Sequence, residues 1–136
     1  MNEYYSITTQ ADITRFLEET NDLHDGYIIS VQYQNDGIVP IPHGHEFHPE
    51  KAKLRIQILV TSIFDTVVEL LFTGIAEWQI KDSMWDMTQT AISFTKDGQI
   101  IWTNEYSTAP EVRKDCSYVI AASMKWKIVN FSKITE

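Results

Sequence analysis

The sequence predicts an α+β fold, with one N-terminal helix packed on a curved, mainly antiparallel sheet or small open barrel of about six strands. Three observations predict this fold class. One segment near the N-terminus has the apolar spacing of an amphipathic helix, and most of the remaining chain alternates apolar and polar residues, as half-buried strands do. The intervals between these strands are too short for the crossover helices that parallel pairing needs. With 136 residues, of which 43% are hydrophobic, the chain is expected to form a single domain over residues 1–136.

The helix is predicted over residues 10–22. Thr9, followed three positions later by Asp12, is typical of a weak capping box, in which two side chains satisfy the first free amides of a helix. The apolar residues that follow at helical spacing are Ile13, Phe16 and Leu17. Asp25-Gly26 is expected to stop the helix, because glycine readily adopts the left-handed conformation that ends helices.

The strand patterns begin after this stop. Tyr27 to Tyr33 is rich in β-branched and aromatic residues, and residues 51–61 alternate most cleanly between apolar and polar. Residues 66–75 are apolar on both faces, which indicates a central strand that bends at Gly74 and continues to residue 80. The other segments of the β-rich body, residues 51–130, are 91–96 and 99–104, which flank the hairpin signal Asp97-Gly98, and a long last strand, 118–128.

The alternation in the last strand assigns one face to Ile120, Ala122, Met124, Trp126 and Ile128. Trp78, Trp102 and Trp126 all fall within strand patterns, which predicts that they lie in the core.

Residues 34–50 are predicted to be a long loop, because they hold three of the four prolines, and proline cannot donate to a central strand. Asn35-Asp36-Gly37 is a turn signal, which allows Ile38-Val39 to pair with the preceding strand. A loop of this length is unusual in a small domain and is typical of a functional or mobile segment.

The same loop contains three of the four histidines. In an extended backbone His43 and His45 point the same way, so they could share an ion, and His48 or Glu46 would complete three protein ligands with one open position. The alternative is that these histidines are solvated or form structural hydrogen bonds. No resident cofactor is expected from the sequence.

The formal net charge of −8 is concentrated in the first third of the chain. Residues 1–50 hold nine acidic residues and one basic residue, whereas the charges of residues 51–136 cancel. Such asymmetry steers a basic partner toward the protein, although it is also typical of a face that only keeps a protein soluble. It argues against nucleic-acid binding, which needs clustered Lys and Arg. The residues expected to contact a protein partner are Glu18, Glu19, Asp22, Asp25 and the methionine-flanked Trp85. The alternative for Trp85 is that it folds back with Met84 to cap an open end of the sheet.

The sequence lacks the motifs of common enzymes, so we expect no catalytic residues. It has no nucleophile elbow around a serine and no glycine-rich phosphate loop. His24-Asp25, at the end of the predicted helix, is interpreted as a structural turn into the first strand, because catalytic partners meet across space rather than along the sequence. The single cysteine, Cys116, is interpreted as inert packing and favours a reducing, cytoplasmic environment. No apolar stretch approaches the length of a membrane span, and no secretory signal is expected.

Several of these features together resemble small uncharacterised bacterial proteins. Phe16-Leu17 and Leu23-His24-Asp25, which lead into the strand Tyr27 to Tyr33, are followed by a strand-rich body and the closing segment Ala122 to Trp126. Several families of such proteins look like the immunity proteins of bacterial polymorphic toxin systems, and the chain is similar to these families. This resemblance implies a cytoplasmic inhibitor that binds and blocks one cognate toxin without catalysis, with His24 and Asp25 at the motif positions.

The function expected from the sequence is therefore that of a protein-binding module, an immunity-type inhibitor that uses an acidic surface against a basic toxin domain. Two alternatives remain open. One is a β domain that binds a small ligand within its curved sheet. The other is a metal-binding protein built on His43, His45 and His48.

Overall fold

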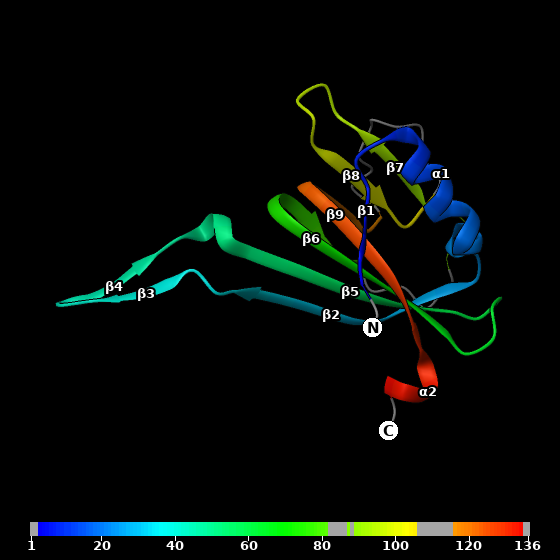
Figure 1. Ribbon diagram of the computed structural model, residues 1–136, viewed down its shortest axis with the longest axis horizontal. Helices are drawn as coiled ribbons and strands as arrows, with labels where there is room; N and C mark the ends of the chain where they lie inside the picture. The colour runs from blue at the N-terminus through cyan, green and yellow to red at the C-terminus, as the bar shows by residue number, and fades with distance from the viewer. Residues whose placement is uncertain (1–2, 82–86, 88, 106–115, 135–136) are drawn as a thin grey trace.

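The computed structural model describes residues 3–81, 87, 89–105 and 116–134, and it confirms the predicted α+β class (Figure 1). The main sheet is antiparallel and not closed, with strand order β2-β5-β6-β9-β8-β7 and a short β1 beside β9; a separate two-stranded sheet is formed by β3 and β4. The helices are α1 (Gln10–Glu19) and α2 (Phe131–Ile134), and the strands are β1 (Tyr5–Ser6), β2 (Gly26–Asn35), β3 (Ile38–Ile41), β4 (Gly44–Phe47), β5 (Ala52–Val60), β6 (Thr66–Gln79), β7 (Ala91–Phe94), β8 (Ile100–Thr103) and β9 (Tyr118–Asn130). No helix in these described ranges has the length and apolarity that a bilayer crossing requires.

Helix α1 begins where the sequence predicts but ends earlier. The Thr9 hydroxyl accepts a hydrogen bond from the Asp12 amide at 3.2 Å, and the Asp12 carboxylate accepts one from the Thr9 amide at 3.0 Å, so the capping box is confirmed. The predicted last turn, up to residue 22, is wrong. After Thr20 the backbone takes positive φ at Asn21, which ends the right-handed helix, and residues Asn21–Leu23 form a separate one-turn segment.

The core lies between α1 and one face of the curved sheet, which we call the inner face. Alternate residues of β5, from Ala52 to Val60, are buried on this face, as the sequence predicts. The rings of Phe16 and Trp126 meet edge to face, with centroids 5.2 Å apart, and so dock α1 on β9. Trp102 and Trp126 are fully buried, which confirms two of the three predicted core tryptophans. The prediction is wrong for Trp78, which is 36% exposed because β6 leaves the core after its bend.

The bend in β6 lies at Gly74, as predicted. Gly74 has φ +63, and a Cβ atom there would lie 2.6 Å from Cβ of Ala122 on β9. The irregular pairing in this region also shifts the buried face of β9. Val119 and Ala121 are buried with Met124 and Trp126, whereas the sequence places them on the opposite face from Met124.

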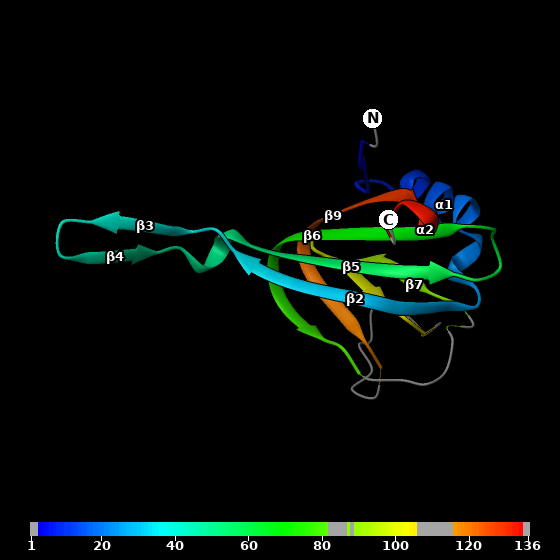
Figure 2. The same cartoon turned by 90° about the horizontal axis from the view of Figure 1, so that it is seen from below.

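The predicted loop 34–50 is wrong in its central part, which forms a β-hairpin. Ile38–Ile41 pairs with Gly44–Phe47, and not with the preceding strand as the turn signal allows. Figures 1 and 2 show that this hairpin, which we call the arm, projects from the body of the molecule as a direct continuation of β2 and β5. Proline is compatible with the arm because Pro40 lies in a two-stranded sheet whose strands both have an open edge.

Two short elements were not expected from the sequence. Strand β1 pairs with β9 through Tyr5 and Ser6, and α2 follows β9 directly. The predicted hairpin around Asp97-Gly98 is confirmed as β7 and β8, in which Phe94 pairs with Ile100.

Candidate protein-interaction surface

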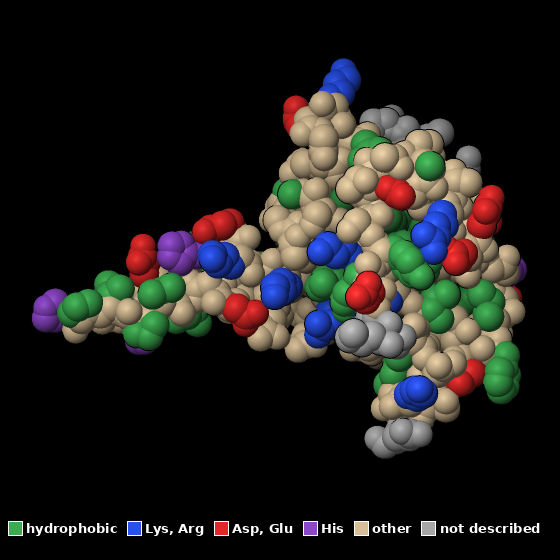
Figure 3. Space-filling view, in the orientation of Figure 1, with side chains coloured by type: hydrophobic (Ala, Val, Ile, Leu, Met, Phe, Trp, Pro, Cys, Tyr) green, Lys and Arg blue, Asp and Glu red, His purple; other side chains and the backbone are tan. Residues whose placement is uncertain are grey.

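Exposed apolar side chains are concentrated along β2 and the arm. Thirteen large hydrophobic side chains are exposed in the described residues, and eight of them lie between residues 27 and 47. We call these eight the apolar strip: Tyr27, Ile29, Val31, Tyr33, Ile38, Val39, Ile41 and Phe47. Figure 3 shows hydrophobic side chains along the arm. A concentration of exposed apolar side chains along one segment is typical of an interaction site, whereas single exposed apolar residues are ordinary.

The position of β2 explains the exposure of the first half of the strip. Strand β2 is the last strand at one side of the sheet, and α1 covers the inner face farther along, at β9. Val31 and Tyr33 stand opposite Ile56 and Leu54, which places them on the inner face. The Tyr33 ring stacks on Trp78, with centroids 5.6 Å apart and planes 14° apart. These side chains therefore extend the core outward without being covered.

The arm carries the second half of the strip. Ile38 pairs with Phe47, and each is 57% exposed, so one face of the arm presents a cross-strand apolar pair to the surroundings. None of the arm residues belongs to the hydrophobic core. A two-stranded hairpin is marginally stable by itself in water, so an apolar projection of this kind is suited to contact with another surface.

The acidic residues nominated from the sequence lie at the opposite end of β2 from the arm. We call Glu18, Glu19, Asp22 and Asp25 the acidic turn. Glu18 and Glu19 are exposed on α1, and Glu19 is paired with Arg15 at 2.6 Å. Asp22 and Asp25 are half-buried, and the Nε2 atom of His24 lies 3.5 Å from Oδ1 of Asp25. The structure therefore places these four nominated residues on one segment, and Trp85, the fifth, lies outside the described residues.

The backbone of the acidic turn is unusual, because the residues at 21, 22, 23 and 25 all have positive φ. This conformation costs most residues about 1–2 kcal/mol each, although Asn and Asp tolerate it better. Leu23 is the residue among these four that is neither Asn nor Asp. Its side chain is fully buried and anchors the turn in the core. His24-Asp25 thus forms part of the turn into β2.

Hydrogen bonds from two other segments brace this turn. The Asp25 carbonyl accepts from the Thr61 hydroxyl at 2.8 Å, and the His24 carbonyl accepts from the Ser62 hydroxyl at 2.9 Å. The Thr90 amide donates to the Asp22 carbonyl at 3.1 Å. The turn therefore holds its carboxylates on a defined backbone, which lowers the entropy lost when a partner binds.

The acidic first third does not form one patch. Figure 3 shows carboxylates at the α1 end of the molecule and again on the arm. At the arm, the Oδ2 atom of Asp36 lies 3.9 Å from Nζ of Lys53, and Glu46 and Glu50 lie on either side of His48. The two acidic groups therefore flank the apolar strip rather than merge with one another.

The three candidate metal ligands lie at different positions along the arm. His43 is in the turn at the tip of the arm, and His45 is exposed on β4, opposite Pro40. His48 lies at the base, with Nδ1 3.3 Å from Oε1 of Glu50 and Nε2 3.7 Å from Oε1 of Glu46. Within the described ranges, no three His, Cys, Asp or Glu side chains come together as a metal site.

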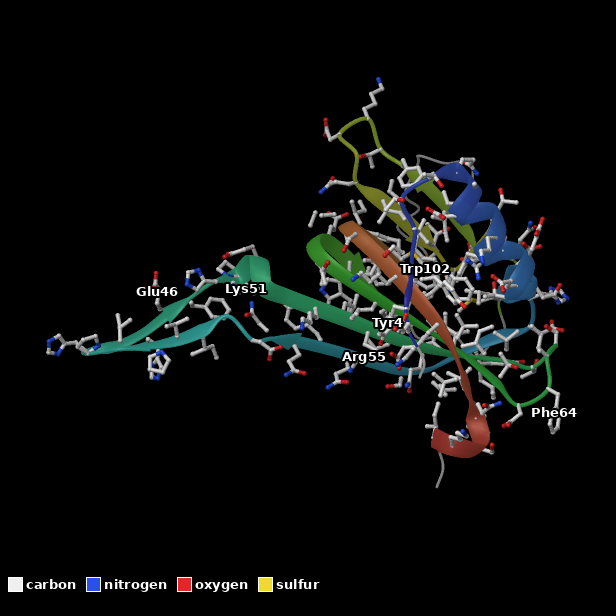
Figure 4. All side chains as sticks on the ribbon, in the orientation of Figure 1. Tyr4, Glu46, Lys51, Arg55, Phe64 and Trp102 are labelled. Carbon is white, nitrogen blue, oxygen red and sulfur yellow. The ribbon has the colours of Figure 1, made fainter. Side chains whose placement is uncertain are left out.

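A further charged cluster, centred on Glu69 of β6, lies on the outer face of the sheet, away from α1. Glu69 accepts hydrogen bonds from the Tyr4 hydroxyl and, at 2.9 Å, from the Gln57 amide. Its Oε2 atom lies 3.4 Å from Nε of Arg55 and 3.8 Å from Nζ of Lys127. Figure 4 shows Tyr4 and Arg55 close together on this face.

Electrostatics in this cluster favour the ionised carboxylate. Burial would raise the pKa of Glu69, but the hydrogen bonds from Tyr4 and Gln57 and the charges of Lys127 and Arg55 outweigh it and lower that pKa below its usual range. Burial, with the hydrogen bond to Glu69, raises the pKa of Tyr4. The cluster therefore ties the N-terminal segment to the sheet. Sequence analysis missed it, although a glutamate inside the apolar run 66–75 is a signal for a buried ion pair.

Two other sites have simpler roles. Cys116 is buried, as the packing interpretation expects.

A cleft of about 360 Å³ lies where the arm joins the body, and it is lined by Asp36, Glu50, Lys51, Ala52, Lys53 and Thr73. This cleft is outside the curved sheet, whose inner face is filled by core side chains such as Trp102 and Phe72.

Comparisons of the chain with protein-family models, with curated proteins and with solved structures find no match.

Proposed function

We propose that this protein is a protein-binding module, an immunity-type inhibitor that blocks a basic toxin domain. The observation that carries the proposal is the apolar strip on β2 and the arm, which is flanked at one end by the acidic turn and at the other by the carboxylates of the arm. Such an inhibitor would act in the cytoplasm, where a single buried cysteine stays reduced.

The two parts of this surface would contribute differently to binding. The apolar strip offers aromatic and branched side chains, which lose water on contact and dominate the affinity of most interfaces. The acidic turn and the net charge of −8 would attract a basic partner over distance and raise the association rate. The braced backbone of the turn supports this role, because its carboxylates need little ordering on binding.

The test uses the product of the gene adjacent to that of this protein as the candidate partner. The two proteins are purified and their dissociation constant is measured by calorimetry for the wild type and for the double variant Ile38→Ala, Phe47→Ala. We expect affinity to fall about 100-fold, because two hot-spot side chains each contribute about 1–2 kcal/mol. The control is Phe64→Ala, which removes a 96% exposed phenylalanine outside the strip and should leave affinity unchanged.

The acidic contribution is tested by association kinetics. The double variant Glu18→Gln, Asp22→Asn should slow association at low salt and flatten its dependence on salt, while Asp97→Asn with Glu105→Gln, elsewhere on the body, should not. If the adjacent gene encodes a toxin and co-expression with this protein gives no protection, the proposal is wrong.

A further inference from the structure

Strand β2 has an open edge that no other strand of the described residues covers along its length. It is the terminal strand of the sheet, and on its free side the described residues pair with it only at Gly26, through Met87. Its ten residues, Gly26–Asn35, include no charged residue and no proline. Seven of them are exposed.

Soluble proteins usually protect such an edge, because its free N–H and C=O groups can pair with another chain. Common protections are a lysine, a proline, a very short strand or a bulge. Of these, β2 has only the irregularity between Ile28 and Ser30. From Ser30 to Asn35 its pairing with β5 is regular, and no described strand pairs with its other edge over this stretch.

The charges at the ends of β2 indicate what would pair with it. Asp25 immediately precedes the strand and Asp36 immediately follows it. A second copy in full antiparallel register would place Asp25 opposite Asp36 of its partner at both ends, and like charges directly opposite destabilise a sheet. Lys53 and Arg55 lie on β5, one strand farther in; Nζ of Lys53 is 3.9 Å from Oδ2 of Asp36, and Nε of Arg55 is 3.4 Å from Oε2 of Glu69. The edge is therefore suited to a strand with basic ends.

We propose that β2 binds an extended segment of a basic protein by strand addition, which would continue the sheet into the partner. The segment would carry Lys or Arg at both ends, near Asp25 and Asp36, and apolar residues at alternate positions between them. These apolar side chains would pack beside Val31 and Tyr33 on the inner face. The inference rests on the proposed function, of which it specifies the recognition mode.

The test uses synthetic peptides with the full-length protein. The probe is a peptide of alternating Val and Thr with two lysines at each end. One comparison peptide has glutamates in place of the lysines, and another is N-methylated at alternate amides, which removes hydrogen-bond donors from one edge while keeping the side chains. Binding is followed by NMR shifts of the backbone amides and by titration.

We expect the lysine peptide to shift amides of Ser30 to Asn35 and to bind at least tenfold more tightly than either comparison peptide. The variant Asp36→Asn should weaken binding about threefold at low salt, whereas Asp97→Asn should not change it. The inference is overturned if the N-methylated peptide binds equally well, if the shifts lie outside β2, or if sedimentation shows a dimer that the lysine peptide dissociates.

The test separates this inference from the proposed function. If the lysine peptide binds at β2 but the adjacent gene product does not bind the protein, strand addition stands and the inhibitor role fails. If the gene product binds without shifting the amides of β2, the inhibitor role stands and strand addition fails.

Discussion

Glu69 illustrates how a single residue depends on contacts that its neighbours in sequence do not provide. Its side chain is 8% exposed and lies between Arg55 of β5 and Lys127 of β9. It also accepts a hydrogen bond from the Tyr4 hydroxyl. Each of these groups favours the ionised form. The carboxylate therefore stabilises the fold only while it carries its charge.

We expect Glu69→Gln to lower the free energy of unfolding by about 2 kcal/mol at pH 7, because hydrogen bonds to a charged group contribute about 1.5–3 kcal/mol. The pKa of Glu69 is lower in the folded protein than in the unfolded chain, so its contribution is complete above the unfolded pKa and is lost as the pH falls through the folded pKa. The difference between the two proteins should therefore shrink in acid.

Urea unfolding at pH 7 and at pH 3 measures this difference. The matched control is Glu18→Gln, an exposed glutamate on α1, which should change stability little at either pH. Equal destabilisation of Glu69→Gln at both pH values would contradict a stabilising role for the charge of this carboxylate.

At the scale of elements, the bend of β6 determines which side chains reach the core. Gly74 takes a left-handed conformation and approaches Ala122 of β9 more closely than any side chain allows. Beyond this bend the side chain of Trp78 lies outside the core and stacks on Tyr33 of β2, although β5 separates β6 from β2 in the sheet.

We expect Gly74→Ala to lower the free energy of unfolding by about 2–5 kcal/mol, from backbone strain together with the clash against Ala122. The matched control is Gly98→Ala in the β7–β8 turn. Gly98 has φ +81 but nothing within 4 Å of the added methyl group, so only the backbone strain of about 1–2 kcal/mol applies. Thermal and urea unfolding of both variants measure the difference, and equal losses would contradict a steric role for Gly74.

At the scale of the whole molecule, the arm and the body are separate structural units. The arm strands pair only with each other among the described strands, and the arm contributes no residue to the core. Its base is held by the Asn35 side chain, whose amide donates to the carbonyl of His48 at 3.2 Å, and by the His48 amide, which donates to Gly37 at 2.9 Å.

We therefore expect the body to fold without the arm. Replacing residues 38–47 by an Asn-Gly turn keeps the pairing of Gly37 with His48 and should change the free energy of unfolding by no more than about 0.5 kcal/mol. The same variant should lose most of its affinity for the partner protein. Calorimetric unfolding and binding measured on one preparation check both results, and a cooperative loss of the body fold would contradict the separation.

The sequence is sufficient for features whose cause is local. The capping box of Thr9 and Asp12, the Asp97-Gly98 hairpin and the alternation of β5 each depend on residues close together in the chain, so their patterns are readable without the fold. Four of the candidate contact residues, those of the acidic turn, were also nominated in this way, because charge is visible in composition; their contact with a partner stays a prediction.

Other features depend on which strands become neighbours. The β2 half of the apolar strip is exposed because β2 is the terminal strand of the sheet, and the same residues would be core if another strand and a helix covered them. The Glu69 cluster forms because the register of three strands places Gln57 and Lys127 opposite Glu69 and Arg55 diagonally next to it. Strand order and register arise from the long-range burial of apolar surface, which no short stretch of sequence specifies.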